Sequence, residues 1–154
     1  MSATPIERFR VKDPHVGVHL GIFVEPYLGF VLDGSKTIES RFGVQRCAPH
    51  GRVVVGDVLL LKKVGGPVIG ACRIAETWFF DLQKVSLDFI REQFARPLCA
   101  DDPAFWEQRA RATLATLMRI EHVTRIDPIH VDKRDRRGWV TLREGASLFS
   151  WVTG

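Results

Sequence analysis

Cysteine is scarce in this chain, and no long hydrophobic run is present. Three cysteines, Cys47, Cys72 and Cys99, stand at unrelated spacings, and their odd number argues against a disulfide framework. No uncharged stretch approaches the roughly 18 apolar residues of a membrane-spanning helix. The first 13 residues are too polar for a secretory signal peptide. We therefore expect a protein of the reducing cytoplasm that has no membrane partner.

Motifs for metals and for nucleoside triphosphates are also missing. Cys47 and His50 supply two ligands at Cys-x-x-His spacing, and no second Cys/His pair follows, whereas a structural zinc site needs four ligands. No Gly-x-x-x-x-Gly-Lys phosphate loop is present, which argues against nucleoside triphosphate hydrolysis. We expect neither a metal nor another cofactor.

The composition is that of one globular domain. Of the 154 residues, 45% are hydrophobic and 26% are charged, which excludes a disordered chain and a collagen-like chain. We expect an N-terminal arm over residues 1–14 and a single domain over residues 15–154.

The positive charge is concentrated in one segment. The formal net charge is +4, and residues 34–63 contain six basic and two acidic residues, so the whole excess lies there. Arginine accounts for 16 of the 22 basic residues, and its planar guanidinium suits phosphate. A phosphate-binding face is the functional interpretation, and an ordinary solvated surface is the alternative.

Hydrophobic periodicity predicts short strands separated by a few helices. Alternation of apolar residues and turn signals predict strands over residues 16–25, 37–42, 52–55, 58–64, 68–80, 118–126 and 138–142. Pro26 and Gly34 delimit a short helix, Ser86 suits the N-cap of a helix through Leu98, and Asp102-Pro103 opens another. Helices do not alternate one for one with strands. We therefore expect an α+β fold, a small β-barrel of about six strands with inserted helices.

The segment from Gly34 to Arg41 is the densest candidate for a functional site. Glu39 and Arg41 are two residues apart on a predicted strand, so their side chains leave the same face. Lys36 lies where the preceding helix gives way to this strand. The three groups suit a phosphate site in which Glu39 orients the cations or accepts a proton. An exposed ion pair of little energetic value is the alternative.

The pattern Gly34-x-Lys36-x-x-Glu39-x-Arg41 resembles the G-x-K-x-x-E-x-R signature of the ASCH family in the PUA-like superfamily. Similarity continues through residues 51–53, 55–59 and 70–74 to Lys133-Arg134-Asp135-Arg136-Arg137-Gly138-Trp139-Val140. It spans most of the chain, from about His19 to Leu142. The resemblance implies a PUA-like barrel, a cleft rimmed by the signature residues, and association with RNA.

RNA is therefore the expected partner, and the phosphate and base contacts can be assigned to named residues. The phosphate contacts are predicted at Lys36, Arg41, Arg46, Lys62 and Lys63, with Arg134, Arg136 and Arg137 at a far rim. Trp139 or Tyr27 is predicted to stack on a base. Whether the RNA is single-stranded or structured, and how many chains assemble, stay open at this point.

Catalysis is the alternative function. Some relatives are ribonucleases, and the resemblance then implies that Lys36 stabilises negative charge while Glu39 acts as the base. Others deacetylate acetylcytidine with the signature lysine, a threonine three positions later and a distant glutamate. Here that threonine position holds Glu39, which removes the proposed nucleophile. A protein-interaction module without a nucleic-acid role is the third hypothesis.

Overall fold

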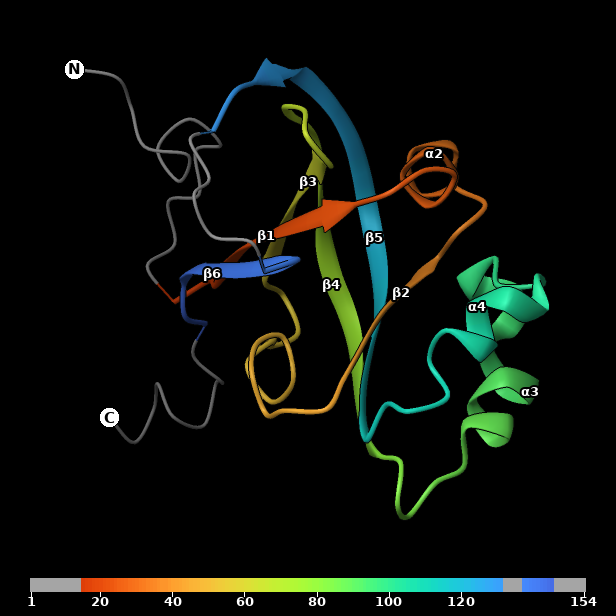
Figure 1. Cartoon of the computed structure of the whole chain (residues 1–154). Coiled ribbons are helices and arrows are strands. Elements are labelled where there is room, and N and C mark those ends of the chain that lie inside the picture. The colour runs from red at the N-terminus through yellow and green to blue at the C-terminus, as the bar shows by residue number, and fades with distance from the viewer. Residues whose placement is uncertain (1–14, 132–136, 146–154) are drawn as a thin grey trace.

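A computed structural model describes residues 15–131 and 137–145, so the expected arm over residues 1–14 lies outside the described residues. Six strands form one curled sheet in the order β2-β5-β4-β3-β1-β6 (Figure 1). The elements are β1 (Val18–Phe23), α2 (Tyr27–Asp33), β2 (Ile38–Gly43), β3 (Val58–Lys63), β4 (Val68–Asp81), α3 (Leu87–Leu98), α4 (Pro103–Glu107), β5 (Leu114–Ile129) and β6 (Trp139–Arg143).

The sheet is a half-barrel, which confirms the expected fold class. Strands β1 and β3 are parallel, and the other pairings are antiparallel. The long strands β4 and β5 pair with three register shifts. Such bulges bend a sheet and increase its twist, so the sheet curls until its edge strands β2 and β6 approach each other across a seam.

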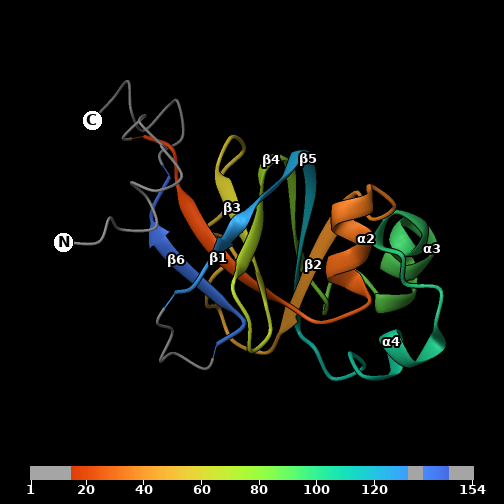
Figure 2. The ribbon, with the colours of Figure 1, turned by 90° about the horizontal axis from the view of Figure 1, so that it is seen from above.

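The three helices gather on one side of the sheet, beyond β2, and β6 lies at the opposite side (Figure 2). Helices α3 and α4 begin where the sequence predicts: Ser86 Oγ accepts a hydrogen bond from Phe89 N, and Asp102 Oδ1 accepts one from Ala104 N. The buried apolar residues of α3 and α4 share one core cluster with the sheet, and those of α2 belong to another. Within the described residues, no helix is long and apolar enough to cross a membrane.

Residues 52–55 were predicted to be a strand, and this prediction is wrong. The chain there forms turns, because its backbone folds around the carboxylate of Asp57. Val54 N donates to Asp57 Oδ2 at 3.0 Å, and Gly56 adopts a φ of 96°, a left-handed conformation that glycine accepts without steric cost. This turn around Asp57 therefore overrides the alternation of apolar residues.

Asp57 joins three parts of the half-barrel. Its side chain is 2% exposed, and its Oδ1 accepts a hydrogen bond from Gly17 N at 2.9 Å. Its Oδ2 also accepts from His19 Nε2 at 2.7 Å. On the other side of the ring, His19 Nδ1 accepts from Trp139 Nε1 at 3.2 Å. These bonds connect the turn before β3 with β1 and β6.

Replacing Asp57 with alanine is expected to lower the free energy of unfolding by about 3 kcal/mol, because several buried or partly buried donors lose their acceptor together. Urea denaturation measures this loss. The matched control is Asp127→Ala, which removes an exposed carboxylate from β5 and should stay within about 0.5 kcal/mol of the wild type. Equal stability of the two variants would show that the Asp57 network does not stabilise the fold.

Candidate functional site

The turn after α2 brings Lys36 to the start of β2. Gly34 ends the helix with a φ of 86°, the left-handed cap conformation that favours glycine. Ser35 N then donates to Asp33 Oδ1 at 2.8 Å, and Lys36 N donates to Phe30 O at 3.0 Å. This local geometry turns the chain back onto the helix, so the Lys36 side chain points into the protein.

Lys36 is buried, which is unusual for a lysine. Only 2% of the residue is exposed, and Nζ donates to Leu98 O at 2.7 Å. The ammonium group lies 5.4 Å from the centroid of the Tyr27 ring. Burial lowers the pKa of Lys36, while the nearby Glu39 carboxylate opposes this shift. The bond to Leu98 O therefore fixes the position of the ammonium group, which has lost most of its contact with water.

Glu39 is also buried, with 5% of the residue exposed. Its Oε1 accepts a hydrogen bond from Ser40 N at 2.7 Å, and its Oε2 lies 3.9 Å from Arg41 Nη2. The carboxylate thus sits between the cations, where its negative charge partly compensates theirs.

Arg41 bridges the seam between the edge strands. Its Nη1 donates to Gly138 O at 2.9 Å, and its Nη2 donates to Ile22 O at 3.0 Å. The guanidinium carbon lies 4.9 Å from the Phe23 ring centroid and 5.3 Å from that of Trp139. The side chain is 20% exposed, and burial lowers its pKa. Arg41 therefore has a structural role besides any contact with a ligand.

Arg109, in the turn after α4, is a site residue that the sequence reasoning missed. Its Nη1 donates to Phe105 O at 2.8 Å, and its guanidinium carbon lies 3.6 Å from the Phe105 ring centroid. Burial lowers the pKa of Arg109, and the nearby Tyr27 and Glu39 oppose this shift. Phe105 and Arg109 are four residues apart near the predicted helix, and this spacing indicates that their side chains meet. It does not indicate that Arg109 lies in the same cleft as Glu39.

These side chains line one cleft with a volume of about 410 Å³, here called the Lys36 cleft. Three cations and one carboxylate meet there on partly aromatic walls. Its polar lining includes Tyr27, Lys36, Glu39, Ser40, Arg41 and Arg109. The arrangement suits an anionic ligand, because the cationic groups outnumber the carboxylate and the low-dielectric walls strengthen their attraction for it.

Two of the predicted residues lie elsewhere. Trp139 and Arg137 line a second cavity, with a volume of about 310 Å³, on the other side of Arg41. Trp139 is 3% exposed and packs in the core beneath the Arg41 guanidinium. It therefore presents no free ring face of the kind that stacking on a base requires.

Three other basic candidates that the structure describes, Arg46, Lys62 and Lys63, do not line either cavity. Lys62 is 8% exposed, and its Nζ donates to Lys63 O at 3.2 Å. Lys63 and Arg46 are exposed. Arg134 and Arg136 lie outside the described residues. The charged segment found in the sequence is thus divided in space, and only part of it reaches the Lys36 cleft.

The Cys47-x-x-His50 pair does not gather further ligands. His50 Nδ1 instead makes a 3.2 Å hydrogen bond with Thr116 Oγ1. Over residues 15–131 and 137–145, no three side chains of histidine, cysteine, aspartate or glutamate come together in a group that could hold a metal ion.

Comparison with solved structures identifies the fold. ASCH from Zymomonas mobilis superposes with a TM-score of 0.64 at 13% identity, over 85% of this chain and 90% of that chain. Two point mutants of the same protein give TM-scores of 0.64 and 0.66. Protein EF3133 from Enterococcus faecalis gives 0.52 at 15% identity, over 83% of this chain and 92% of that chain.

No protein-family model and no curated protein matches the sequence. The likeness is therefore one of fold. The protein has an α+β half-barrel with the fold of ASCH from Zymomonas mobilis, which confirms the fold expected from the sequence.

Replacing Arg41 with lysine is expected to destabilise the protein by about 1–2 kcal/mol, because a single ammonium group cannot reproduce the fork that bonds both Gly138 O and Ile22 O. Urea denaturation measures the change. The matched control is Arg46→Lys, a substitution at an exposed loop position. If both lysine variants unfold at the same urea concentration, the bridge does not stabilise the seam.

Proposed function

We propose that this protein binds RNA and that the Lys36 cleft receives phosphate groups of the RNA backbone. The observation that carries the proposal is the convergence of Lys36, Arg41 and Arg109 around a single carboxylate, Glu39, in one cleft. Phosphate contacts of this kind supply most of the affinity in RNA binding and depend on salt concentration.

The cations keep hydrogen-bond donors for a ligand after their internal bonds are counted. An ammonium group has three donors and a guanidinium group has five. The Lys36 ammonium group uses one donor, to Leu98 O, and the Arg109 guanidinium group uses one, to Phe105 O. Each can therefore hold its own position and still donate to a phosphate oxygen.

Burial also favours an anionic ligand. It lowers the pKa values of Lys36, Arg41 and Arg109, so the charged form of each residue costs more free energy in the folded protein than in water. A bound phosphate group offsets that cost. Proteins retain unfavourable buried charges of this kind at functional sites.

The same proposal extends the binding surface beyond the cleft for longer RNA. Arg46, Lys63 and Arg137 are exposed cations that we assign to additional backbone contacts, as we do Arg134 and Arg136 from the sequence. Such contacts add affinity without sequence preference.

A ribonuclease is the second candidate function. Glu39 places a carboxylate next to the Arg41 guanidinium, at 3.9 Å, and Lys36 lines the same cleft. In this alternative Glu39 accepts the proton of a ribose hydroxyl, and Lys36 stabilises the charge that develops on phosphorus-bound oxygen. An acetylcytidine amidohydrolase is the weaker version, because Glu39 occupies the position of the threonine nucleophile.

Lys36→Gln and Arg109→Gln are each expected to weaken binding of a short RNA about tenfold, since each removes a charge-assisted phosphate contact. The slope of log affinity against log salt should fall by about 0.7 for each variant. Fluorescence anisotropy over a salt series measures both quantities, and circular dichroism confirms folding.

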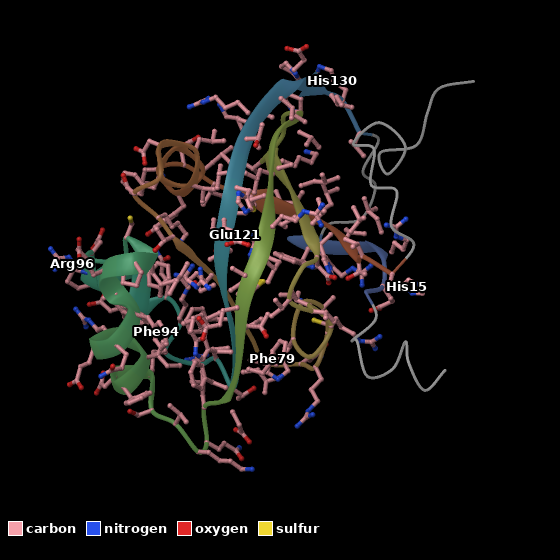
Figure 3. All side chains as sticks on the ribbon, turned by 180° about the vertical axis from the view of Figure 1, so that it is seen from behind. His15, Phe79, Phe94, Arg96, Glu121 and His130 are labelled. Atoms are coloured by element: carbon pink, nitrogen blue, oxygen red, sulfur yellow. The ribbon has the colours of Figure 1, made fainter. Side chains whose placement is uncertain are left out.

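The matched controls are Lys84→Gln and Arg96→Gln, both at exposed positions; Arg96 lies on the outer side of α3 (Figure 3). These controls should bind RNA like the wild type. Equal weakening by controls and cleft variants would mean that general surface charge binds the RNA, and wild-type affinity in the cleft variants would sink the proposal.

Glu39→Gln separates binding from catalysis. The amide keeps the shape of the side chain but cannot act as a general base. If the protein is a ribonuclease, cleavage of a labelled RNA should stop while the affinity stays within about threefold of the wild-type value. A binding protein shows no cleavage in either form, and cleavage that persists in the variant would rule out Glu39 as the base.

A further inference from the structure

The second cavity, here called the His50 cavity, shares two lining residues with the Lys36 cleft. Arg41 and Phe42 line both. A ligand in one space is therefore separated from a ligand in the other by little more than these two side chains. The function proposed for the Lys36 cleft leaves the His50 cavity without a role.

Polar groups in the His50 cavity are held in defined positions. His50 Nδ1 bonds with Thr116 Oγ1 at 3.2 Å, and the ring meets Phe79 edge to face, with 5.5 Å between centroids. Phe79 lies on β4, and Figure 3 shows it away from the α3 face that carries Phe94. Burial, aided by Arg46, lowers the pKa of His50, which favours the neutral ring. Its Nε2 has no hydrogen-bond partner among the described residues.

One donor of Arg41 has no acceptor in the part of the chain that the structure describes. This donor is the buried Nε atom. A buried donor without an acceptor is unfavourable and calls for an explanation. The Arg41 side chain as a whole is 20% exposed, so a ligand in the cavity contacts its exposed part and not the buried Nε.

We propose that the His50 cavity binds one nucleobase of the RNA whose backbone occupies the Lys36 cleft. This inference rests on the proposed function. A volume of about 310 Å³ is at the small end for ligand sites, which suits a single heterocycle and excludes a folded RNA element. Carbonyl oxygens and ring nitrogens of a base suit the exposed part of Arg41 and the imidazole of His50 as hydrogen-bond partners.

A base can enter such a cavity only if it is unpaired and leaves the stack of its neighbours. We therefore expect the protein to prefer single-stranded RNA. Sequence-specific RNA recognition commonly reads splayed bases in this way, by stacking and by hydrogen bonds to their edges. The phosphates then position the strand, and the His50 cavity holds one base of it.

The test compares two eight-nucleotide RNAs by fluorescence anisotropy. One carries two copies of each base, and the other has hydrogen in place of every base. The wild type should bind the RNA with bases about tenfold more tightly, as expected for one held base. His50→Ala and Thr116→Val should each reduce this preference to below threefold while leaving affinity for the abasic RNA unchanged. Thr116→Val is nearly isosteric, which protects the buried position.

The matched control is His130→Ala, at the far end of β5 (Figure 3), which should keep the tenfold preference. Failure of the wild type to bind either RNA would overturn the proposed function itself. Equal binding of both RNAs would overturn the base site alone. An equal loss of affinity for both RNAs in His50→Ala would show that His50 supports the backbone site, and would also overturn the base site.

Discussion

The fork of hydrogen bonds from Arg41 is the interaction on which the site depends. The sheet curls but leaves a seam between β2 and β6, and one guanidinium crosses it to reach Gly138 O and Ile22 O. An arginine suits this task because its donors diverge at fixed angles. The same side chain lines the Lys36 cleft and the His50 cavity. The residue that closes the half-barrel is therefore also a wall of both cavities.

A buried network of Asp57, His19 and Trp139 packs against the Arg41 guanidinium. Asp57 bonds His19, His19 accepts from Trp139, and the Trp139 ring lies under the Arg41 guanidinium. Each member is nearly inaccessible to water, and hydrogen bonds among satisfied buried groups hold them in a single arrangement. A chain of buried contacts therefore links the turn before β3 to Arg41, which lines the cleft.

Local rules were enough for part of the fold and of the site. The caps at Ser86 and Asp102 and the glycine at residue 34 act within a few residues, and they mark helix ends in the sequence as they do in the structure. Strand periodicity likewise placed Glu39 and Arg41 on one face. The turn at residues 52–55 was mispredicted because Asp57 organises it through contacts with Gly17 and His19, some 40 and 38 residues away.

The sequence by itself determined the segment that supplies Lys36, Glu39 and Arg41, since their spacing along one turn and one strand is a local property. Only the tertiary structure decided that Arg109 joins them, that Trp139 is buried beneath Arg41, and that Lys62 is buried. The reason is physical. Charge along a chain shows how many cations are present, whereas burial and the curl of the sheet decide which of them face one cleft.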